Sequence, residues 1–249
     1  MRVLVSGLYG HMGREVAALL KKGTEGGELA AGVSLDIDGT FDVPCSESFQ
    51  DAECDVDCII DFSHHSCTKD LLEFAVSHEI PLVLATTGQT EEEKQMIQEA
   101  ASCIPLFFAA NYSLGVALLI DLAKKAAAVM SGAEIEIIER HHNRKVDAPS
   151  GTALAIAHAI QEVRPDSQIV NGRNGYGKRQ PNDIGIHAVR MGNIVGSHEV
   201  VIGTDNQSIT LKHEAYSRAL FAEGAVKAAA FLMGKPAGLY DMNDLLRED

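Results

Sequence analysis

The segment from Glu139 to Ala153 places proton-transfer groups beside a potential anion-binding site. Two adjacent imidazoles, His141 and His142, are followed closely by the ammonium group of Lys145. An imidazole titrates near neutral pH and suits general acid/base chemistry, and a lysine can donate a proton or stabilise an anion. The run Ser150-Gly151-Thr152 then begins a predicted helix, whose first backbone N–H groups can hold a carboxylate. The segment is therefore suited to chemistry on a small acidic substrate.

Proline and basic residues complete this segment. Pro149 fits the first turn of the predicted helix, where a missing N–H costs nothing. Arg140, Arg144 and Lys145 lie together in a chain whose formal net charge is -14. An acidic chain with a pI near 5.1 repels nucleic acid and anionic membranes, so we expect neither as a partner. The local basic cluster must therefore attract the anionic substrate.

The length of the apolar runs and the spacing of the cysteines indicate the cellular compartment. No apolar run approaches the roughly 18 residues of a membrane span, and the N-terminal residues predict a strand rather than a signal peptide, so we expect a cytoplasmic protein. The five cysteines form an odd count without Cys-x-x-Cys spacing, which indicates reduced thiols. Cys54, Cys58 and Cys67 lie near His64 and His65, but their spacing is poor for zinc, and we expect no metal.

The elements that position these groups fall into two sets. The first half alternates apolar β-rich runs with helical patterns, which is typical of a parallel sheet built from βαβ units. We predict strands at Arg2 to Ser6, Leu29 to Leu35, Val56 to Phe62, Pro81 to Thr86 and Pro105 to Ala109, and helices at His11 to Lys22, Ser66 to Ser77, Glu91 to Ser102 and Leu114 to Met130.

The pattern changes after the long helix. Strands are predicted at Glu134 to Arg140, Ile184 to Arg190, Val195 to Thr204 and Gln207 to Ala215, with helices at Gly151 to Val163 and Ala219 to Met233. Consecutive strands without helices between them favour an antiparallel or mixed sheet. The expected fold class is thus α/β, with a Rossmann-like dinucleotide-binding domain (1–112 and 218–249) that carries a parallel sheet. An α+β domain for substrate binding and oligomerisation (113–217) is inserted into it.

A glycine-rich turn follows the first strand and predicts a dinucleotide site. The run Gly7-Leu8-Tyr9-Gly10-His11-Met12-Gly13 departs from G-x-G-x-x-G spacing, but its glycines still permit a tight turn and a close approach to a pyrophosphate. Asp36, at the end of the second strand, can accept hydrogen bonds from the adenosine ribose. Two later strand ends, Ala85-Thr86-Thr87 and Ala109-Ala110-Asn111-Tyr112, reach the same sheet edge, where ligands bind in open α/β folds.

The run His-His-x-x-Lys-x-Asp-x-Pro-Ser-Gly-Thr at residues 141–152 resembles the signature of the 4-hydroxy-tetrahydrodipicolinate reductase family, formerly dihydrodipicolinate reductase, of the diaminopimelate and lysine pathway. The resemblance covers nearly the whole chain, from the glycine turn to the segment between Arg190 and His198. It implies reduction of a cyclic, unsaturated imine dicarboxylate by a reduced nicotinamide, and a homotetramer joined through the sheet of the second domain.

The resemblance also implies residue roles. His141 and Lys145 match the family's catalytic residues, and His142 matches a substrate contact. The two later strand ends match segments that line the nicotinamide side, although Ala85 replaces a common glycine. Arg190, His198 and Arg218 lie in family-like segments without an assigned role. The remaining histidines are interpreted as structural or surface residues: His64, His65, His158, His187 and His213.

Cofactor choice and two alternative functions remain open at this point. Asp36 favours NADH because a carboxylate repels the 2′-phosphate of NADPH, and Ile37 and Asp38 add no positive charge; NADPH remains possible. One alternative is another two-domain dehydrogenase acting on an amino acid, which has no reason to carry the His-His-x-x-Lys run. The other is a non-catalytic dinucleotide-sensing module, which needs the glycine turn and Asp36 but not His141.

Overall fold

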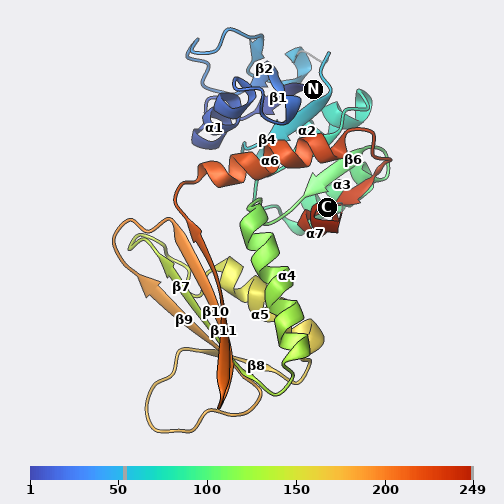
Figure 1. Ribbon diagram of the computed structural model, residues 1–249. Helices are drawn as coiled ribbons and strands as arrows, with labels where there is room; N and C mark the ends of the chain where they lie inside the picture. Colours follow the sequence, from blue (N-terminus) through green and yellow to red (C-terminus); the bar gives the residue numbers. More distant parts are fainter. Residues whose placement is uncertain (53–54, 248–249) are drawn as a thin grey trace. The chain divides into compact units, whose positions relative to one another are not determined.

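The computed structural model describes residues 1–52 and 55–247, so Cys54 lies outside the described residues. The chain divides into two compact units (Figure 1). The first comprises Met1–Ser113 with Ala219–Asp249, and the second comprises Leu114–Arg218. No helix among the described residues is long and apolar enough to cross a membrane.

The first unit is built on a seven-stranded parallel sheet with the order β12-β6-β5-β4-β1-β2-β3. The strands are β1 (Arg2–Ser6), β2 (Glu28–Val33), β3 (Cys45–Ser46), β4 (Cys58–Asp61), β5 (Leu82–Leu84), β6 (Pro105–Phe108) and β12 (Gly238–Tyr240). The order of the first six strands is the one found in dinucleotide-binding folds. The predicted Rossmann-like parallel sheet is therefore confirmed, while the short strands β3 and β12 were not predicted.

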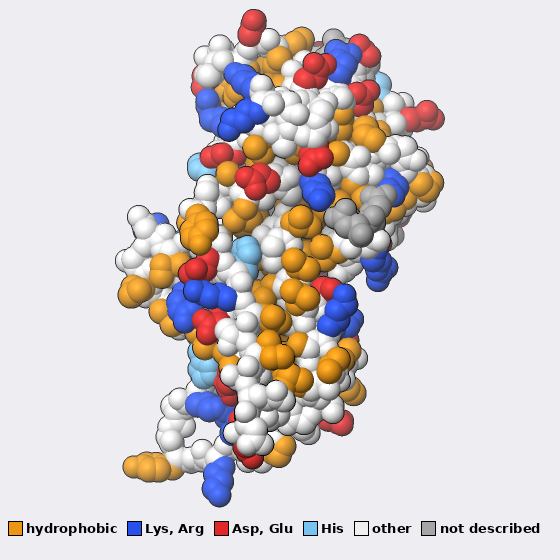
Figure 2. Space-filling view, in the orientation of Figure 1, with side chains coloured by type: hydrophobic (Ala, Val, Ile, Leu, Met, Phe, Trp, Pro, Cys, Tyr) orange, Lys and Arg blue, Asp and Glu red, His pale blue; other side chains and the backbone are white. Residues whose placement is uncertain are grey.

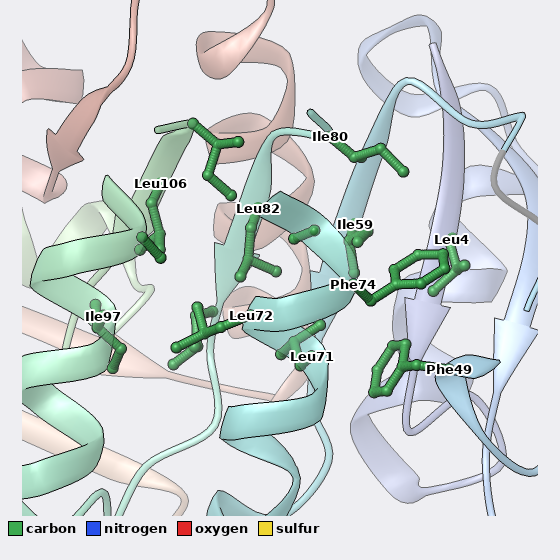
Figure 3. Close-up of a cluster of buried hydrophobic side chains, with 14 of the residues drawn as sticks. Leu4, Phe49, Ile59, Leu71, Leu72, Phe74, Ile80, Leu82, Ile97 and Leu106 are labelled. Carbon is green, nitrogen blue, oxygen red and sulfur yellow. The ribbon is translucent and has the colours of Figure 1, made fainter. Parts of the chain in front are cut away.

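Helices cover both faces of this sheet. The central strands β4 and β5 are therefore buried on both sides. They are α1 (His11–Leu20), α2 (Thr68–Ser77), α3 (Glu91–Ala101), α6 (Ala219–Leu232) and α7 (Met242–Arg247), with short 3-10 turns η1 (Thr24–Gly26), η2 (Phe49–Asp51) and η3 (His65–Cys67). Figure 3 shows one face, where Leu4, Ile59, Leu82 and Leu106 of four strands meet α2 and α3. On the other face, α6 contacts α1 and strands β4, β5 and β6.

The second unit is a five-stranded mixed sheet with the order β11-β10-β7-β9-β8. Its elements are α4 (Leu114–Val129), β7 (Glu134–His141), α5 (Gly151–Val163), β8 (Gln168–Asn171), β9 (Asp183–Arg190), β10 (Gly196–Thr204) and β11 (Gln207–Ala215). Strand β10 is antiparallel to β7 and β11, whereas β9 is parallel to β7 and β8. Of the two sheet types left open by the sequence, the structure has the mixed one, and β8 is an additional strand.

Apolar side chains of α4 and α5 pack against this sheet and form the core of the second unit. Ile135, Ile137, Val200 and Ile202 are almost completely buried in that core. On the face shown in Figure 2, the described Lys and Arg side chains are interspersed with Asp and Glu side chains.

Candidate active site

Strand β7 carries two polar residues on its buried face. Its side chains alternate between buried and partly exposed positions, so Glu139 and His141 share a face with Ile135 and Ile137. Glu139 is 0% exposed and His141 is 9% exposed. Burying a carboxylate is costly unless hydrogen bonds and opposite charges compensate it. The partners of Glu139 therefore determine the structure of this region.

Glu139 receives hydrogen bonds from three segments of the second unit. The Nδ1 atom of His141 lies 2.6 Å from Oε2, and the Arg190 guanidinium donates to both carboxylate oxygens at 2.8 and 2.7 Å. The backbone N–H of Ser150 donates to Oε1 at 3.0 Å. Burial alone raises the pKa of Glu139, but the bonds from His141, Arg190 and Ser150 outweigh it and lower the pKa to about 2. We call these four residues the Glu139 network.

The network fixes how His141 can act. With Nδ1 bound to a carboxylate, the ring offers Nε2 to a ligand, as an acceptor when neutral and as a donor when protonated. Space beside Nε2 is provided by Gly196, where an added Cβ would lie 3.2 Å from that atom. The strand register explains the assembly, because His141 pairs with Arg190 on β9. Sequence reasoning named His141 but assigned no role to Glu139.

His198 extends the network on β10. It pairs with Glu139 in the strand register, is 4% exposed, and its Nε2 atom lies 3.0 Å from Ser150 Oγ. Its ring meets that of His141 edge-on, with 5.1 Å between centroids. Burial, reinforced by the nearby His141, lowers the pKa of His198 to about 4. His198 is therefore a neutral buried side chain at physiological pH, and it supports the start of α5.

The start of α5 differs in detail from the expectation. Ser150 is the N-cap, and its Oγ accepts a hydrogen bond from the Ala153 N–H at 3.2 Å. Pro149 was expected in the first turn; instead it precedes the cap, joined to Ala148 by a cis peptide bond. Because the Ser150 N–H and Oγ are already bound within the protein, Ser150 holds the helix end in place. The backbone of Gly151 and Thr152 forms the first turn.

The loop after β7 carries Lys145 and His142. It is tied to residues 191–193 by hydrogen bonds from Met191 N to His141 O, from Asn143 N to Gly192 O, and from Arg144 to Asn193. The Lys145 ammonium lies 2.8 Å from Asp147 Oδ1 and lowers the pKa of that carboxyl.

His142 lies among positive charges. Burial lowers the pKa of its imidazole, and so do the charges of Arg144, Arg218, His141 and Lys145. The structure thus brings His141, His142, Lys145 and the start of α5 into one basic region, to which Arg218 also belongs. Arg218 had no assigned role in the sequence interpretation, because only the fold brings it near residue 142.

In the first unit, the glycine turn forms a backbone cradle. Gly7 has a φ of +76°, and an added Cβ would lie 2.4 Å from the Phe62 carbonyl oxygen. A Cβ at Gly13 would lie 2.1 Å from the Gly7 carbonyl oxygen. Only glycine fits these positions, which hold the turn against the start of α1. This geometry suits a dinucleotide, because a helix N-terminus and closely packed backbone N–H groups bind phosphates.

Two cavities along the first unit contain most of the predicted cofactor residues. One, of about 420 Å³, is lined by Gly7, Tyr9, Gly10 and Asp36. The other, of about 430 Å³, is lined by Met12, Ala85, Thr86, Thr87, Ala110, Asn111 and Tyr112. Both cavities share Phe62, Ser63 and His64, so they form one groove. We call them the adenosine-side and the nicotinamide-side cavity, after the ends of a dinucleotide that each would hold.

Some predicted cofactor residues reach the groove less directly. Leu8 is fully buried, so its side chain belongs to the core, and Ala109 and His11 are absent from the described lining of either cavity. The Tyr112 hydroxyl is buried and lies 2.9 and 3.0 Å from the carbonyl oxygens of Leu84 and Phe107. Tyr112 therefore lines the groove, while its hydroxyl is bound to carbonyl groups of the sheet region.

His64 and His65 were interpreted from the sequence as structural or surface residues, and the structure adds their position in the groove. Both line the nicotinamide-side cavity. The signal was present, because they follow β4 at its carboxyl end, the same position relative to a strand that identified Thr86 and Asn111. No group of three or more His, Cys, Asp or Glu side chains among the described residues could hold a metal ion.

Comparisons with known proteins agree across both units. The family model "Dihydrodipicolinate reductase, N-terminus" matches residues 1–112, and "Dihydrodipicolinate reductase, C-terminus" matches residues 115–246. A 4-hydroxy-tetrahydrodipicolinate reductase from Caldanaerobacter subterraneus subsp. tengcongensis is 47% identical over 254 residues, covering 100% of this chain and 99% of the relative. One from Clostridium tetani is 41% identical, covering 99% and 97%.

A solved structure agrees with these sequence matches. Dipicolinate-bound dihydrodipicolinate reductase from Paenisporosarcina sp. TG-14 superposes with a TM-score of 0.82 at 26% identity, covering 98% of each chain. The matches include the second half of the chain, which carries the His-His-x-x-Lys run. Another two-domain dehydrogenase has no reason to carry that run, and a dinucleotide-sensing module needs only the nucleotide half. The chain therefore belongs to the 4-hydroxy-tetrahydrodipicolinate reductase family of lysine and diaminopimelate biosynthesis, and it is an NAD(P)H-dependent oxidoreductase.

Proposed function

We propose that His141 and Lys145 are the catalytic residues for the reductase reaction of this chain. The observation that carries the proposal is the pairing of His141 Nδ1 with Glu139 at 2.6 Å, which leaves Nε2 as the ring nitrogen for proton transfer. When bound, the reduced nicotinamide supplies the hydride. A protonated His141 delivers a proton where negative charge develops on the substrate, and the carboxylate of Glu139 stabilises the imidazolium.

Lys145 acts as a second positive group in this proposal. Its ammonium lies 2.8 Å from Asp147, on a loop that is held by hydrogen bonds to residues 191–193. A substrate carboxylate can replace Asp147 as its partner, because the Asp147 side chain is half exposed and exposed ion pairs are weak. Lys145 then neutralises the anionic substrate and stabilises the charge that develops during reduction.

The substrate is held by its carboxylates. We assign one of them to the backbone N–H groups of Gly151 and Thr152 at the start of α5, and a further contact to His142. A helix N-terminus stabilises an anion through its N–H groups and its dipole. Ser150 contributes indirectly, since it caps the helix and is bound to Glu139 and His198. The dipicolinate bound to the solved relative is a planar dicarboxylate and supports this substrate class.

NADH is the proposed preferred cofactor. The adenosine-side cavity is lined by three acidic residues, Asp36, Glu47 and Asp70, and its described lining includes no Lys or Arg. Arg14 is the cation that directly follows the glycine turn in the sequence. It is ion-paired with Asp38 and donates to the Tyr9 carbonyl oxygen at 3.0 Å. A 2′-phosphate would therefore meet uncompensated carboxylates, whereas a ribose diol can donate hydrogen bonds to Asp36.

The second unit is proposed to bind the substrate and to form a homotetramer through its sheet, with the dinucleotide domain built from residues 1–112 and 218–249. Support comes from strand β11, whose nine residues are exposed or partly exposed at the sheet edge. An uncovered edge strand is a site for association. Light scattering on the purified protein measures this directly, and a monomer would contradict it.

One experiment tests the catalytic proposal. The loss of NADH absorbance is followed with freshly generated hydroxytetrahydrodipicolinate, for the wild type and for His141→Asn. Asparagine keeps a side-chain amide that can bind Glu139 but cannot transfer a proton, so turnover should fall while NADH affinity is retained. Equal turnover of the two proteins would remove His141 from the mechanism.

A further inference from the structure

Two adjacent histidines stand in the wall of the cofactor groove. His64 lines both cavities, whereas His65 lines the nicotinamide-side cavity. Their rings are close, with centroids 4.4 Å apart and planes tilted by 41°. The shared wall is also formed by Phe62 and Ser63, and it lies between the cavity that contains Asp36 and the one that contains Asn111. A dinucleotide lying along the groove must pass this wall with its middle section.

Hydrogen bonds within the protein fix the proton on His64. The Ser66 backbone N–H donates to His64 Nδ1 at 3.3 Å, and the Ser66 hydroxyl lies 2.9 Å from the same atom. A backbone N–H can only donate, so Nδ1 carries a lone pair. In the neutral ring the proton therefore sits on Nε2, which makes this atom a hydrogen-bond donor.

The opposite arrangement holds for His65. Its Nδ1 atom lies 3.2 Å from both carboxylate oxygens of Glu93, of which Oε2 also accepts the Thr90 N–H at 2.7 Å. An ionised carboxylate can only accept, so Nδ1 of His65 carries a proton. In the neutral ring the remaining nitrogen, Nε2, has a lone pair. The Nε2 atoms of the two adjacent neutral imidazoles thus differ in character, because that of His64 is a donor and that of His65 is an acceptor.

We propose that His64 and His65 bind the middle section of the dinucleotide, with His64 donating to the pyrophosphate and His65 accepting from a hydroxyl of the nicotinamide ribose. This inference rests on the proposed cofactor groove. Phosphate oxygens are acceptors and ribose hydroxyls can donate, so the two imidazoles match the two groups. The order along the groove agrees, because His64 belongs to both cavities and His65 to the nicotinamide side.

A purely structural role is the competing explanation, since His64 caps η3 and His65, the first residue of η3, is bound to Glu93 in the first turn of α3. Two variants separate the roles. His64→Asn keeps an oxygen that can cap the turn but loses the ring N–H. His65→Phe keeps a ring of similar shape but loses both nitrogens. His158→Asn is a matched control, because His158 is an exposed histidine on α5.

Calorimetric titration with AMP, ADP-ribose and NADH tests the proposal without turnover. AMP reaches only the adenosine side, whereas ADP-ribose carries both the pyrophosphate and the second ribose. We expect both variants to bind AMP within about twofold of the wild type but to bind ADP-ribose and NADH roughly tenfold more weakly, the effect of one lost hydrogen bond to a ligand. The His158→Asn control should match the wild type with all three ligands.

The outcomes are distinct. Unchanged ADP-ribose affinity in both variants, or an equal loss for AMP and ADP-ribose, overturns the inference and leaves the histidines with a structural role. Failure of the wild type to bind either ADP-ribose or NADH overturns the proposed cofactor groove itself. A loss of affinity for ADP-ribose and NADH, but not for AMP, supports both the inference about the two histidines and the proposed cofactor groove.

Discussion

The Nδ1 atom of His141 lies 2.6 Å from Oε2 of Glu139, a carboxylate without exposed surface. A buried carboxylate at this distance sets which ring nitrogen is bound and leaves Nε2 for proton transfer, as the proposed general acid requires. Arg190 and the Ser150 N–H hold the same carboxylate, so the network also joins β7, β9 and the start of α5. One buried charge thus links the catalytic proposal to the stability of the second unit.

Loss of either proposed catalytic group should lower turnover. We expect His141→Ala and Lys145→Ala each to reduce kcat by roughly 10²- to 10⁴-fold, the effect of removing a positioned proton-transfer group. NADH affinity should barely change, because neither residue lines the described cofactor cavities. Steady-state kinetics and direct titration of NADH provide the two measurements. Near-wild-type turnover in both variants would contradict the assignment.

Glu139→Gln should change the pH dependence of stability. The pKa of Glu139 is lowered to about 2 in the folded protein, below the value of about 4.3 in an unfolded chain. A lowered acid pKa stabilises the fold above the unfolded value, and this contribution is lost as pH falls from about 4.3 toward 2. Because glutamine does not ionise, Glu139→Gln should remove this loss of stability at low pH. It should also lower the free energy of unfolding at pH 7 by about 3 kcal/mol, because Arg190 loses its charged partner.

Denaturant unfolding between pH 7 and pH 3 measures this prediction. Glu136→Gln is a useful comparison, because Glu136 forms ion pairs with Arg173, Arg179 and His187 away from the active site. It should lower stability but keep the part of the low-pH stability loss that comes from Glu139, because that carboxylate is still present. A Glu139→Gln protein with the wild-type dependence of unfolding on pH would show that the Glu139 charge is not linked to folding.

The anion site at α5 can be tested by a proline at its first position. Gly151 is the first residue of the helix, and an added Cβ there would meet no atom within 4 Å. Ser150 has an extended conformation, with φ -67° and ψ 151°, which suits a residue before proline. Gly151→Pro therefore removes one N–H donor while the helix is retained.

We expect Gly151→Pro to raise KM and to weaken competitive inhibition by pyridine 2,6-dicarboxylate by roughly tenfold, the effect of one hydrogen bond to a charged group. Gly151→Ala is the matched control, because it adds a Cβ in open space and keeps the N–H. Similar inhibition constants for the proline and alanine variants would exclude this N–H from carboxylate binding.

A methyl group beside His141 should disturb its position. A Cβ at Gly196 would lie 3.2 Å from His141 Nε2, which is closer than an ordinary van der Waals contact. We expect Gly196→Ala to lower kcat at least about tenfold, since small displacements of catalytic groups cost rate. Gly203→Ala lies on the same strand, where the nearest atom would be 3.4 Å away, and should leave kcat unchanged. Equal kcat values in the two variants would show that His141 adapts without cost.

The fold class was predictable because each long element has its own pattern. Strand β1 and helix α5 were predicted with the observed bounds, since apolar periodicity and a capping residue mark them. Strands β3 and β12 were missed, as they have only two and three residues, too few for a pattern. Pro149 was misplaced because a proline before a helix can stand on either side of the N-cap.

The chemistry of the site was only partly visible in the sequence. His141 and Lys145 stand out because they are close together in the chain. Arg190 lies 51 residues from its partner Glu139, and His198 lies 48 residues from its partner Ser150. Strand register brings them together, and register depends on pairing that a single sequence does not display.

The last prediction is cofactor preference. Asp36, Glu47 and Asp70 line the adenosine-side cavity, and Arg14 is engaged by Asp38. A dianionic 2′-phosphate would be repelled there, so we expect NADH to be preferred over NADPH by about tenfold or more in kcat/KM, equivalent to about 1.4 kcal/mol. Steady-state kinetics with both cofactors at saturating substrate provide the comparison.

A double variant tests the physical cause of this preference. Asp36→Ser with Ile37→Arg removes one carboxylate and adds a guanidinium, which should narrow or reverse the preference because arginine binds phosphate through paired N–H groups. Asp42→Ser is the matched control, since Asp42 is exposed and is not among the described residues that line the cavity. It should leave the preference unchanged, because removing a negative charge outside the cavity does not alter contact with the 2′ position. Equal or better use of NADPH by the wild type would show that cations outside the described lining hold the 2′-phosphate.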